Sequence, residues 1–381
     1  MAEIIDNEEI DRDTIEPEIL EQQFSQKYKL LTETAVSVKK SYIKKLHGTK
    51  SLKLGVSQSD NSIEVYELNN TSLSRVCRLS GHGKDLSEVV FSPKEDHLIY
   101  SSGQDGVVKL WDTRDKGKCV QEYKDEDDIE IKPFDCMDVS CNGRVLCAGS
   151  LLVQDDAFLV FWDQHMPKPL GGYWNSHTDD VSQVRFHPEK TEILASGSLD
   201  GLLNIYNILE PTEDDALTYS LNVENSVERI SWVDEHRVAS VTQSNELQLW
   251  NTDTGDLVQS YSRDKIARSI KRSKEDDCYL VDTYTPAGGT PTLLAGSYGG
   301  NGDVLRSVSI TEKKLQPCTD FRENKQTVRC CWYEKDRDLL VTAGESGLIS
   351  VWSRGGGGGA GGGGEAHRAH GKLHAHRHKP Y

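Results

Sequence analysis

The sequence predicts an all-β protein in which similar four-stranded sheets follow one another along the chain. Residues 81–112, GHGKDLSEVVFSPKEDHLIYSSGQDGVVKLWD, are matched residue for residue in spacing by residues 176–207, SHTDDVSQVRFHPEKTEILASGSLDGLLNIYN. Both stretches contain short runs with apolar residues at alternate positions, separated by turn residues, which is typical of antiparallel strands. A unit repeated in this way buries its apolar face against its neighbours, so the sequence predicts a repeat protein.

Polar residues recur at fixed offsets in both units. A histidine stands 23 residues before an aspartate, and an aromatic residue follows that aspartate six residues later. An aspartate in a tight turn can accept hydrogen bonds from the histidine, and a serine on the preceding strand can accept the proton of a buried indole. We therefore expect two structural hydrogen-bond sets: His82, Ser101, Asp105 and Trp111 in one unit, and His177, Ser196, Asp200 and Tyr206 in the other.

The GH dipeptide, the D-G turn and the closing W-D resemble the marks of a WD-repeat propeller blade. Longer stretches are similar to the WD repeat-containing protein 89 group of eukaryotes: residues 147–163, 176–188 and 196–208, and EDDAL at 213–217. This resemblance implies a seven-bladed propeller that acts as an interaction platform in the cytoplasm or nucleus. It implies no catalytic residues.

Counting the position of Trp111 along the chain indicates seven units. The separations are 45, 51, 44, 44, 57 and 45 residues, and the positions are Tyr66, Trp111, Trp162, Tyr206, Trp250, a degenerate Ser307 and Trp352. We therefore predict a seven-bladed WD-repeat β-propeller over residues 23–354.

The last unit is short of one strand. After Trp352 the chain offers only Ser353 and Arg354 before the run GGGGGAGGGG, and glycine has no side chain to pack. Residues 27–43 contain one strand more than the first unit needs. We expect about Tyr28 to Thr34 to supply the missing outer strand, which closes the ring and covers two sheet edges.

Both ends of the chain are predicted to be disordered tails. Residues 1–22 carry nine acidic side chains against one base, Arg12, and too little apolar surface to fold, although Ile15, Ile19 and Leu20 would allow a short helix on a partner. Residues 355–381 are rich in glycine and then in histidine. We expect a solvated tail there, with weak binding of a transition metal or an anionic partner as the alternative.

Composition narrows the class of protein. The net charge is -17, with 61 acidic against 44 basic residues, and no basic stripe interrupts the repeats, so nucleic-acid binding through the propeller is not expected. No apolar run approaches the length of a membrane span. The nine cysteines are scattered without C-x-x-C pairs, which favours free thiols in a reducing compartment, the cytoplasm, the nucleus or both. We expect a monomeric propeller.

The sequence does not predict an enzyme. His82, Ser101 and Asp105 are the residue types of a nucleophilic triad, but the same set recurs with the same offsets around His177, which a structural device explains and an active site does not. The expected inner strands, VSQVRF and LSEVVF, show no paired histidine or carboxylate pattern around a central channel. We expect no cofactor and no functional metal site.

One loop stands out as a candidate protein-binding surface. LGGYWNSHTDDV, residues 170–181, places Tyr173 and Trp174 near Asp179 and Asp180, and aromatic residues beside charge are typical of interface hot spots. The alternative is that Tyr173 or Trp174 completes an outer strand. Acidic runs at residues 125–128 and 213–215 would enlarge a negative rim.

These observations predict a non-enzymatic scaffold that binds one or more proteins, with basic partners favoured by the net charge. Assembly of ribosomal or other basic complexes is one alternative within this class. A substrate receptor of a cullin-type ubiquitin ligase is another; it would use a W-D-x-R signature, and residues 111–114 read WDTR, ending in Arg114.

Overall fold

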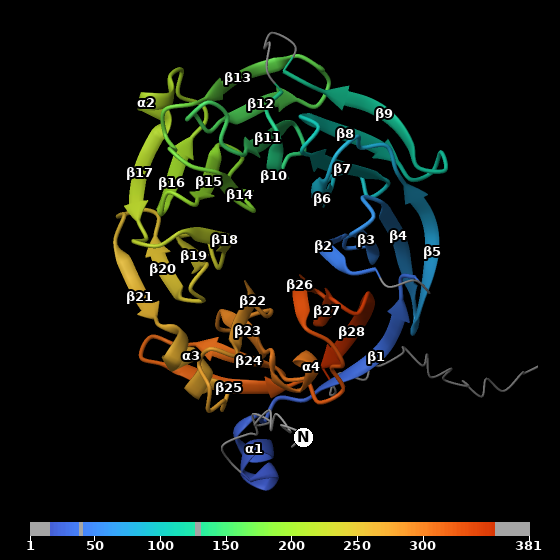
Figure 1. The fold of residues 1–381 in the computed structure, drawn as a ribbon, viewed down its shortest axis with the longest axis vertical. Coiled ribbons are helices and arrows are strands. Elements are labelled where there is room, and N and C mark those ends of the chain that lie inside the picture. Colours follow the sequence, from blue (N-terminus) through green and yellow to red (C-terminus); the bar gives the residue numbers. More distant parts are fainter. Residues whose placement is uncertain (1–15, 38–40, 126–130, 355–381) are drawn as a thin grey trace, which may run out of the picture.

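Seven antiparallel sheets of four strands stand around a central axis in the computed structural model, which describes residues 16–37, 41–125 and 131–354 (Figure 1). Each sheet, or blade, runs from an innermost strand at the axis to an outermost strand at the rim. The predicted seven-bladed β-propeller is therefore confirmed. Residues 1–15 of the expected acidic tail 1–22, the expected tail 355–381 and the acidic residues 126–128 lie outside the described residues.

The strands follow the chain in order from inner to outer in the first six blades. Blade one contains β2 (Ile43–Gly48), β3 (Lys53–Gln58), β4 (Ile63–Asn69) and β5 (Ser72–Leu79). Blade two contains β6 (Leu86–Phe91), β7 (Leu98–Gly103), β8 (Val107–Asp112) and β9 (Lys118–Tyr123). Blade three contains β10 (Phe134–Val139), β11 (Val145–Ser150), β12 (Leu159–Asp163) and β13 (Pro169–Tyr173).

Blades four to six continue the same pattern. Blade four contains β14 (Val181–Phe186), β15 (Ile193–Ser198), β16 (Leu202–Asn207) and β17 (Leu217–Asn222), with the short helix α2 (Glu213–Ala216) before β17. Blade five contains β18 (Val227–Trp232), β19 (Arg237–Thr242), β20 (Leu247–Asn251) and β21 (Leu257–Tyr261). Blade six follows the helix α3 (Arg263–Ser269) and contains β22 (Cys278–Tyr284), β23 (Thr292–Ser297), α4 (Gly299–Gly302), β24 (Leu305–Ile310) and β25 (Leu315–Asp320).

Blade seven is completed by the N-terminal strand, as the sequence predicts. Its own strands are β26 (Val328–Glu334), β27 (Leu339–Gly344) and β28 (Leu348–Arg354). The strand β1 (Tyr28–Ala35) pairs antiparallel with β28, from Tyr28 opposite Arg354 to Ala35 opposite Leu348. This pairing joins the two ends of the propeller and covers the outer edge of β28.

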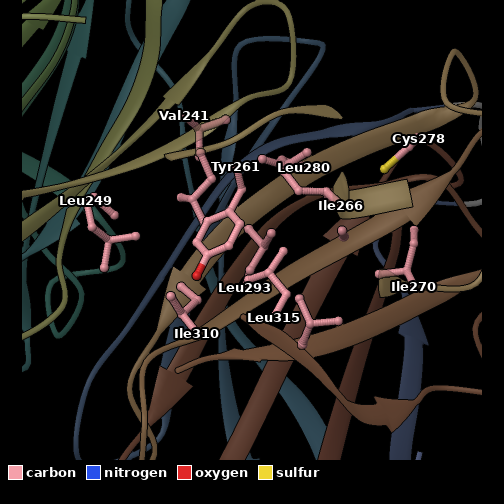
Figure 2. Close-up of a cluster of buried hydrophobic side chains, with 14 of the residues drawn as sticks. Val241, Leu249, Tyr261, Ile266, Ile270, Cys278, Leu280, Leu293, Ile310 and Leu315 are labelled. Atoms are coloured by element: carbon pink, nitrogen blue, oxygen red, sulfur yellow. The ribbon is translucent and has the colours of Figure 1, made fainter. Parts of the chain in front are cut away.

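Apolar side chains between neighbouring blades form the core. In the cluster between blades five and six, Val241 and Leu249 face Leu280 and Leu293 of the next blade (Figure 2). The helix α3 adds Ile266, and Ile270 follows it; both are fully buried. Since burying one such side chain contributes about 1.5–3 kcal/mol, these interfaces between blades hold the ring together.

Blade six differs from the sequence prediction by one residue. The position of Trp111 pairs with the second residue of the neighbouring strand and comes directly after the register shift toward the outer strand. In blade six Val308 meets both conditions, whereas Ser307 precedes the register shift. Because this blade has no tryptophan or tyrosine at that position, the sequence offers no aromatic residue from which to count.

Part of the predicted acidic tail is ordered. Residues Pro17–Gln23 form the helix α1, which lies outside the ring beside β25 (Figure 1). Leu20 and Phe24, one turn apart, are buried there, and the Arg306 guanidinium lies 5.2 Å from the centre of the Phe24 ring. These two apolar side chains, four residues apart, dock the helix against the propeller. The excess of acidic residues in this segment favoured a prediction of disorder instead.

Candidate functional site

The first polar chain links a loop to two strands of blade two. His82 Nδ1 lies 3.0 Å from Asp105 Oδ1, and His82 Nε2 lies 2.7 Å from the hydroxyl of Ser101. That hydroxyl accepts a hydrogen bond from Trp111 Nε1 at 2.8 Å. Burial alone would raise the pKa of the Asp105 carboxyl, but hydrogen bonds from His82 and the Gly83 amide outweigh it and hold that pKa below its usual value.

The second polar chain repeats this geometry in blade four. His177 Nδ1 lies 3.0 Å from Asp200 Oδ2, and its Nε2 lies 2.7 Å from Ser196 Oγ, which lies 3.4 Å from the Tyr206 hydroxyl. Ser101 and Ser196 are both fully buried. A substrate carbonyl cannot reach either hydroxyl, so these chains fix the positions of strands and loops.

The remaining blades keep only parts of this chain. In blade seven Trp352 Nε1 donates to Thr342 Oγ1 at 2.9 Å. Within the described residues, the indole nitrogens of Trp162 and Trp250 and the hydroxyl of Ser240 are buried without a hydrogen-bond partner. Blades three and five are therefore held by their strand ladders and by apolar packing, without this polar chain.

The structure divides the two aromatic residues of the candidate surface between a strand and the solvent. Tyr173 ends β13, pairs with Leu159, and packs its ring against Phe161 and Tyr206, with ring centres 4.8 Å and 5.3 Å away. Trp174 follows the strand and is 53% exposed. Tyr173 thus belongs to the packing between blades three and four, and Trp174 belongs to the surface.

Beside Trp174 a groove of about 550 Å³ runs between β13 and the connection from β16 to β17. Leu170 and Leu209, which are 55% and 77% exposed, line it together with Trp174. Three large apolar side chains left open to solvent in one groove are typical of a protein-binding surface.

Acidic residues form the rim of this groove on the side of blade four. The connection contains Glu210, Glu213, Asp214 and Asp215 and no basic residue between Ile208 and Ala216. Glu213 accepts hydrogen bonds from the Trp174 and Asn175 amides at 3.0 Å and 2.9 Å, which ties α2 to the end of β13. The groove walls are therefore fixed relative to one another.

The two predicted aspartates lie elsewhere. Asp180 lines the central channel, where its Oδ1 accepts from the Leu152 amide at 2.6 Å, and Asp179 is its neighbour. The chain between Trp174 and Asp180 crosses from the outermost strand of blade three to the innermost strand of blade four. The outermost and innermost strands of a blade lie three strand spacings of about 4.8 Å apart. Trp174 and the two aspartates therefore belong to different surfaces.

Arg114 lies on the turn after β8, with 65% of its side chain exposed. Its guanidinium is held by Asp112, with Nη2 at 2.7 Å from Oδ2 and Nε at 3.1 Å from Oδ1. The hydrogen bond from the Arg114 side chain lowers the pKa of the Asp112 carboxyl to about 2. The arginine of the W-D-x-R sequence therefore forms an ion pair with the aspartate of the same sequence in a surface turn.

A second group of residues, which the sequence analysis missed, converges on the central channel. A space of about 330 Å³ is lined by Lys45, Glu88, Arg185, Arg229 and Asp282, among others. Lys45 Nζ lies 3.1 Å and Arg185 Nη2 lies 3.7 Å from Glu88 Oε2. The sequence analysis expected no paired histidine or carboxylate pattern around the channel; the structure brings the carboxylates of Glu88 and Asp282 there together with basic residues from other blades.

This convergence has a signal in the strands themselves. Lys45, Glu88, Arg229 and Asp282 each follow the register shift on the innermost strand of their blade. At this position all four side chains line the central channel. The repeat offset therefore locates these four residues once the innermost strands are aligned, but not Arg185, which lies two residues further along β14.

Two further residues on innermost strands connect neighbouring blades. His47 Nδ1 accepts from the Phe91 amide at 3.1 Å, and Asp138 Oδ2 accepts from the Phe186 amide at 2.7 Å. Burial, helped by the positive charge of Arg185, lowers the pKa of His47 to about 4. Burial raises the pKa of Asp138 to about 6, although Arg185 opposes this.

Two negative findings apply to residues 16–37, 41–125 and 131–354. No group of three or more histidine, cysteine, aspartate or glutamate side chains there is placed to hold a metal ion. No helix in the same ranges is both long and apolar enough to cross a membrane.

Comparison with known proteins identifies the repeat. The WD40 family, described as "WD domain, G-beta repeat", matches residues 73–112, 168–207 and 315–353. Each match begins with the outer strand of one blade and continues through the three inner strands of the next. The chain is a WD-repeat β-propeller.

The propeller also has relatives along most of its length. It is 26% identical over 315 residues to the WD repeat-containing protein 89 homolog of Dictyostelium discoideum, covering 82% of each chain. It is 27% identical to the WD repeat-containing protein GTS1 of Arabidopsis thaliana, over 65% of this chain and 62% of that protein. It is 32% identical to an uncharacterized WD repeat-containing protein of Saccharomyces cerevisiae, over 67% of this chain and 64% of that protein. These relatives imply a protein-interaction scaffold.

Proposed function

We propose that this propeller is a non-enzymatic adaptor that binds one or more basic proteins. The observation that carries the proposal is the groove beside β13, where Leu170, Trp174 and Leu209 are exposed together below an acidic rim. Aromatic and aliphatic side chains supply the binding energy of such a surface, and the acidic rim favours partners of opposite charge. The net charge of -17 adds long-range attraction for the same partners.

The compartment belongs to the same proposal. All nine cysteines are free thiols, five of them buried. Unpaired thiols persist in a reducing environment, which supports a site of action in the cytoplasm, the nucleus or both.

The test has two steps. Affinity purification of the full chain, and of the chain without residues 1–15 and 355–381, should recover defined basic proteins in both cases. Association of a recovered partner should then slow steeply between low and high salt, because charges on the rim steer the encounter. An association rate that does not change with salt contradicts the proposal of a basic partner.

A double variant assigns binding to the groove. Trp174→Ala with Leu209→Ala should weaken binding by about tenfold or more, since both side chains lie in the groove. The matched control is Leu257→Ala with Val258→Ala on β21, where two side chains are exposed to 47% and 44% but line no part of this groove. Equal loss in both double variants would contradict the assignment.

Two narrower roles fit the same class. An assembly factor for ribosomal or other basic complexes would use the acidic groove directly. A ubiquitin-ligase substrate receptor would use Arg114, whose exposed guanidinium Asp112 orients. Arg114→Ala should abolish co-purification of a ligase adaptor in the second role and leave the recovered basic proteins unchanged in the first.

A further inference from the structure

The outer strands contain one position whose side chain crosses to the next blade. Gln121 Nε2 donates to the Gln164 carbonyl at 3.4 Å, the Tyr219 hydroxyl donates to the Asp253 carbonyl at 2.7 Å, and Gln259 Nε2 donates to the Thr311 carbonyl at 2.8 Å. Each acceptor lies on the connection between the third and outer strands of the following blade. These three bonds bridge the gaps after blades two, four and five.

Strand register shows that the three donors are equivalent. Gln121 pairs with Leu110, Tyr219 with Ile205 and Gln259 with Leu249, and each pair adjoins the register shift of its outer strand. In blade three the corresponding pair is Phe161 with Gly171. Blade three therefore has a glycine where its neighbours have a bridging side chain.

The backbone does not require glycine at this position. A Cβ atom at Gly171 would have no heavy atom within 4 Å, and Gly171 is not among the glycines with positive φ. The neighbouring Gly172 differs, because a Cβ atom there would lie 2.9 Å from the Leu159 carbonyl oxygen. Gly172 is needed for the close approach of two strands, whereas Gly171 leaves an open slot.

That slot is part of the groove described above. Gly171 lines it, and so do Ile208 and Leu209 at the start of the blade-four connection. In blade one the equivalent residue is Cys77 on β5. The connection between β8 and β9 of blade two lies close to it, because a Cβ atom at Gly117 would be 3.6 Å from Cys77 Sγ. In blade three the space beside the strand stays open.

Building on the proposed function, we infer that a partner inserts a tyrosine side chain into this slot from an extended, basic segment. The ring would take the place that Tyr219 fills one blade further on, between the apolar walls of Leu170, Trp174 and Leu209. A tyrosine suits this site because its ring can pack against the apolar walls and its hydroxyl can donate to a backbone carbonyl of the adjoining loop. The segment is extended because the slot follows an outermost strand, and it is basic because Glu210 and Asp214 are exposed on the connection.

The probe for this inference is a capped heptapeptide with a central tyrosine, a serine on each side and two basic residues at each end. Titration against the full chain, followed by tryptophan fluorescence, should show binding, because Trp174 borders the slot. The same peptide with alanine in place of tyrosine should bind about tenfold more weakly or worse. Equal binding of both peptides, or no binding of either, would overturn the inference.

Variants of the chain test the slot itself. Gly171→Tyr should fill the slot from within, weaken peptide binding about tenfold or more, and raise the thermal midpoint by adding the bridge that Tyr219 makes elsewhere. Gly171→Ala, which adds one methyl group in open space, should leave binding unchanged. Gln259→Tyr is the matched control, with the same new side chain at the equivalent position of blade five, and it should also leave binding unchanged.

The outcomes separate this inference from the proposed function. If Gly171→Tyr binds recovered basic proteins and the peptide as the wild type does, while Trp174→Ala with Leu209→Ala weakens them, the slot inference is wrong and the adaptor proposal stands. If the wild type recovers no basic protein in a salt-dependent manner, the adaptor proposal fails and the inference fails with it.

Discussion

Replacing His47 or Asp138 with asparagine should change the pH dependence of stability in opposite directions. Both residues lie on innermost strands and accept a backbone amide of the following blade, that of Phe91 or Phe186. At position 47 the side-chain oxygen of asparagine can accept from the Phe91 amide. At position 138 asparagine resembles the protonated carboxyl, because it keeps one of the two oxygens that accept from the Phe186 and Val139 amides. The two variants therefore report on charge rather than on packing.

The sign follows from the direction of each pKa shift. The pKa of Asp138 rises from 3.8 to about 6, so between these values the folded chain binds a proton that the unfolded chain has lost, and stability falls as pH rises. The pKa of His47 falls from 6.5 to about 4, so in that range the unfolded chain binds the extra proton, and stability rises with pH.

The size of each effect follows from the same shifts. A displacement of about two pKa units corresponds to about 3 kcal/mol, and the partial solvent exposure of both residues reduces it to about 2 kcal/mol. Asp138→Asn should thus be more stable than the wild type by about 2 kcal/mol near pH 7, with the gain vanishing near pH 4. The stability of His47→Asn relative to the wild type should increase by about 2 kcal/mol as pH falls from about 6.5 to about 4.

Urea unfolding of the wild type and both variants across this pH range measures these differences. Subtracting the wild-type free energy of unfolding at each pH removes the contributions of titrating groups that all three proteins share, such as Glu88 and Asp282. Parallel curves for the three proteins would refute the reasoning. The same slope for both variants would refute it as well.

Three further predictions concern the propeller framework. Ser196→Ala should lower the free energy of unfolding by about 1–3 kcal/mol, because it leaves His177 Nε2 without its close partner. The control Ser240→Ala removes an unpartnered hydroxyl at the same repeat position and should change the free energy of unfolding by less than about 0.5 kcal/mol. Equal losses for the two variants in urea unfolding would contradict this prediction. Gly103→Ala should destabilise blade two by about 1–3 kcal/mol, since the new Cβ atom would lie 2.7 Å from His82 Nδ1, and an unchanged thermal midpoint would count against that geometry. Deleting residues 1–35 should expose the edge of β28 and convert the protein into larger species on size-exclusion chromatography; a stable monomer would show that β1 is dispensable.

The sequence predicts most of the ring, because the signals that define it are local. The spacing from His82 to Asp105 and from His177 to Asp200 marks two blades, and the spacing of aromatic residues extends the count to the others. The glycine run after Arg354 shows that the last blade lacks a strand. Only one segment near the N-terminus is left over to supply it.

The surfaces are harder to predict from the sequence, because each is formed by residues that are distant in the sequence. Lys45, Glu88 and Arg185 meet in the channel although they come from blades one, two and four. Conversely, Trp174 and Asp180 are close in sequence, yet the radial crossing between blades separates them. The role of Gly171 emerges only when the register of all outer strands is compared.

The pairing of β1 with β28 also has a consequence for synthesis. A ribosome makes Tyr28 before its partner Arg354, which follows 326 residues later in the chain, so β1 cannot pair until all the other strands have been made. During that interval β1 has no partner strand, and its exposed edge can pair with strands of other chains. A premature stop anywhere before Leu348 therefore produces a fragment that cannot close, and such fragments are natural clients for chaperones and proteases.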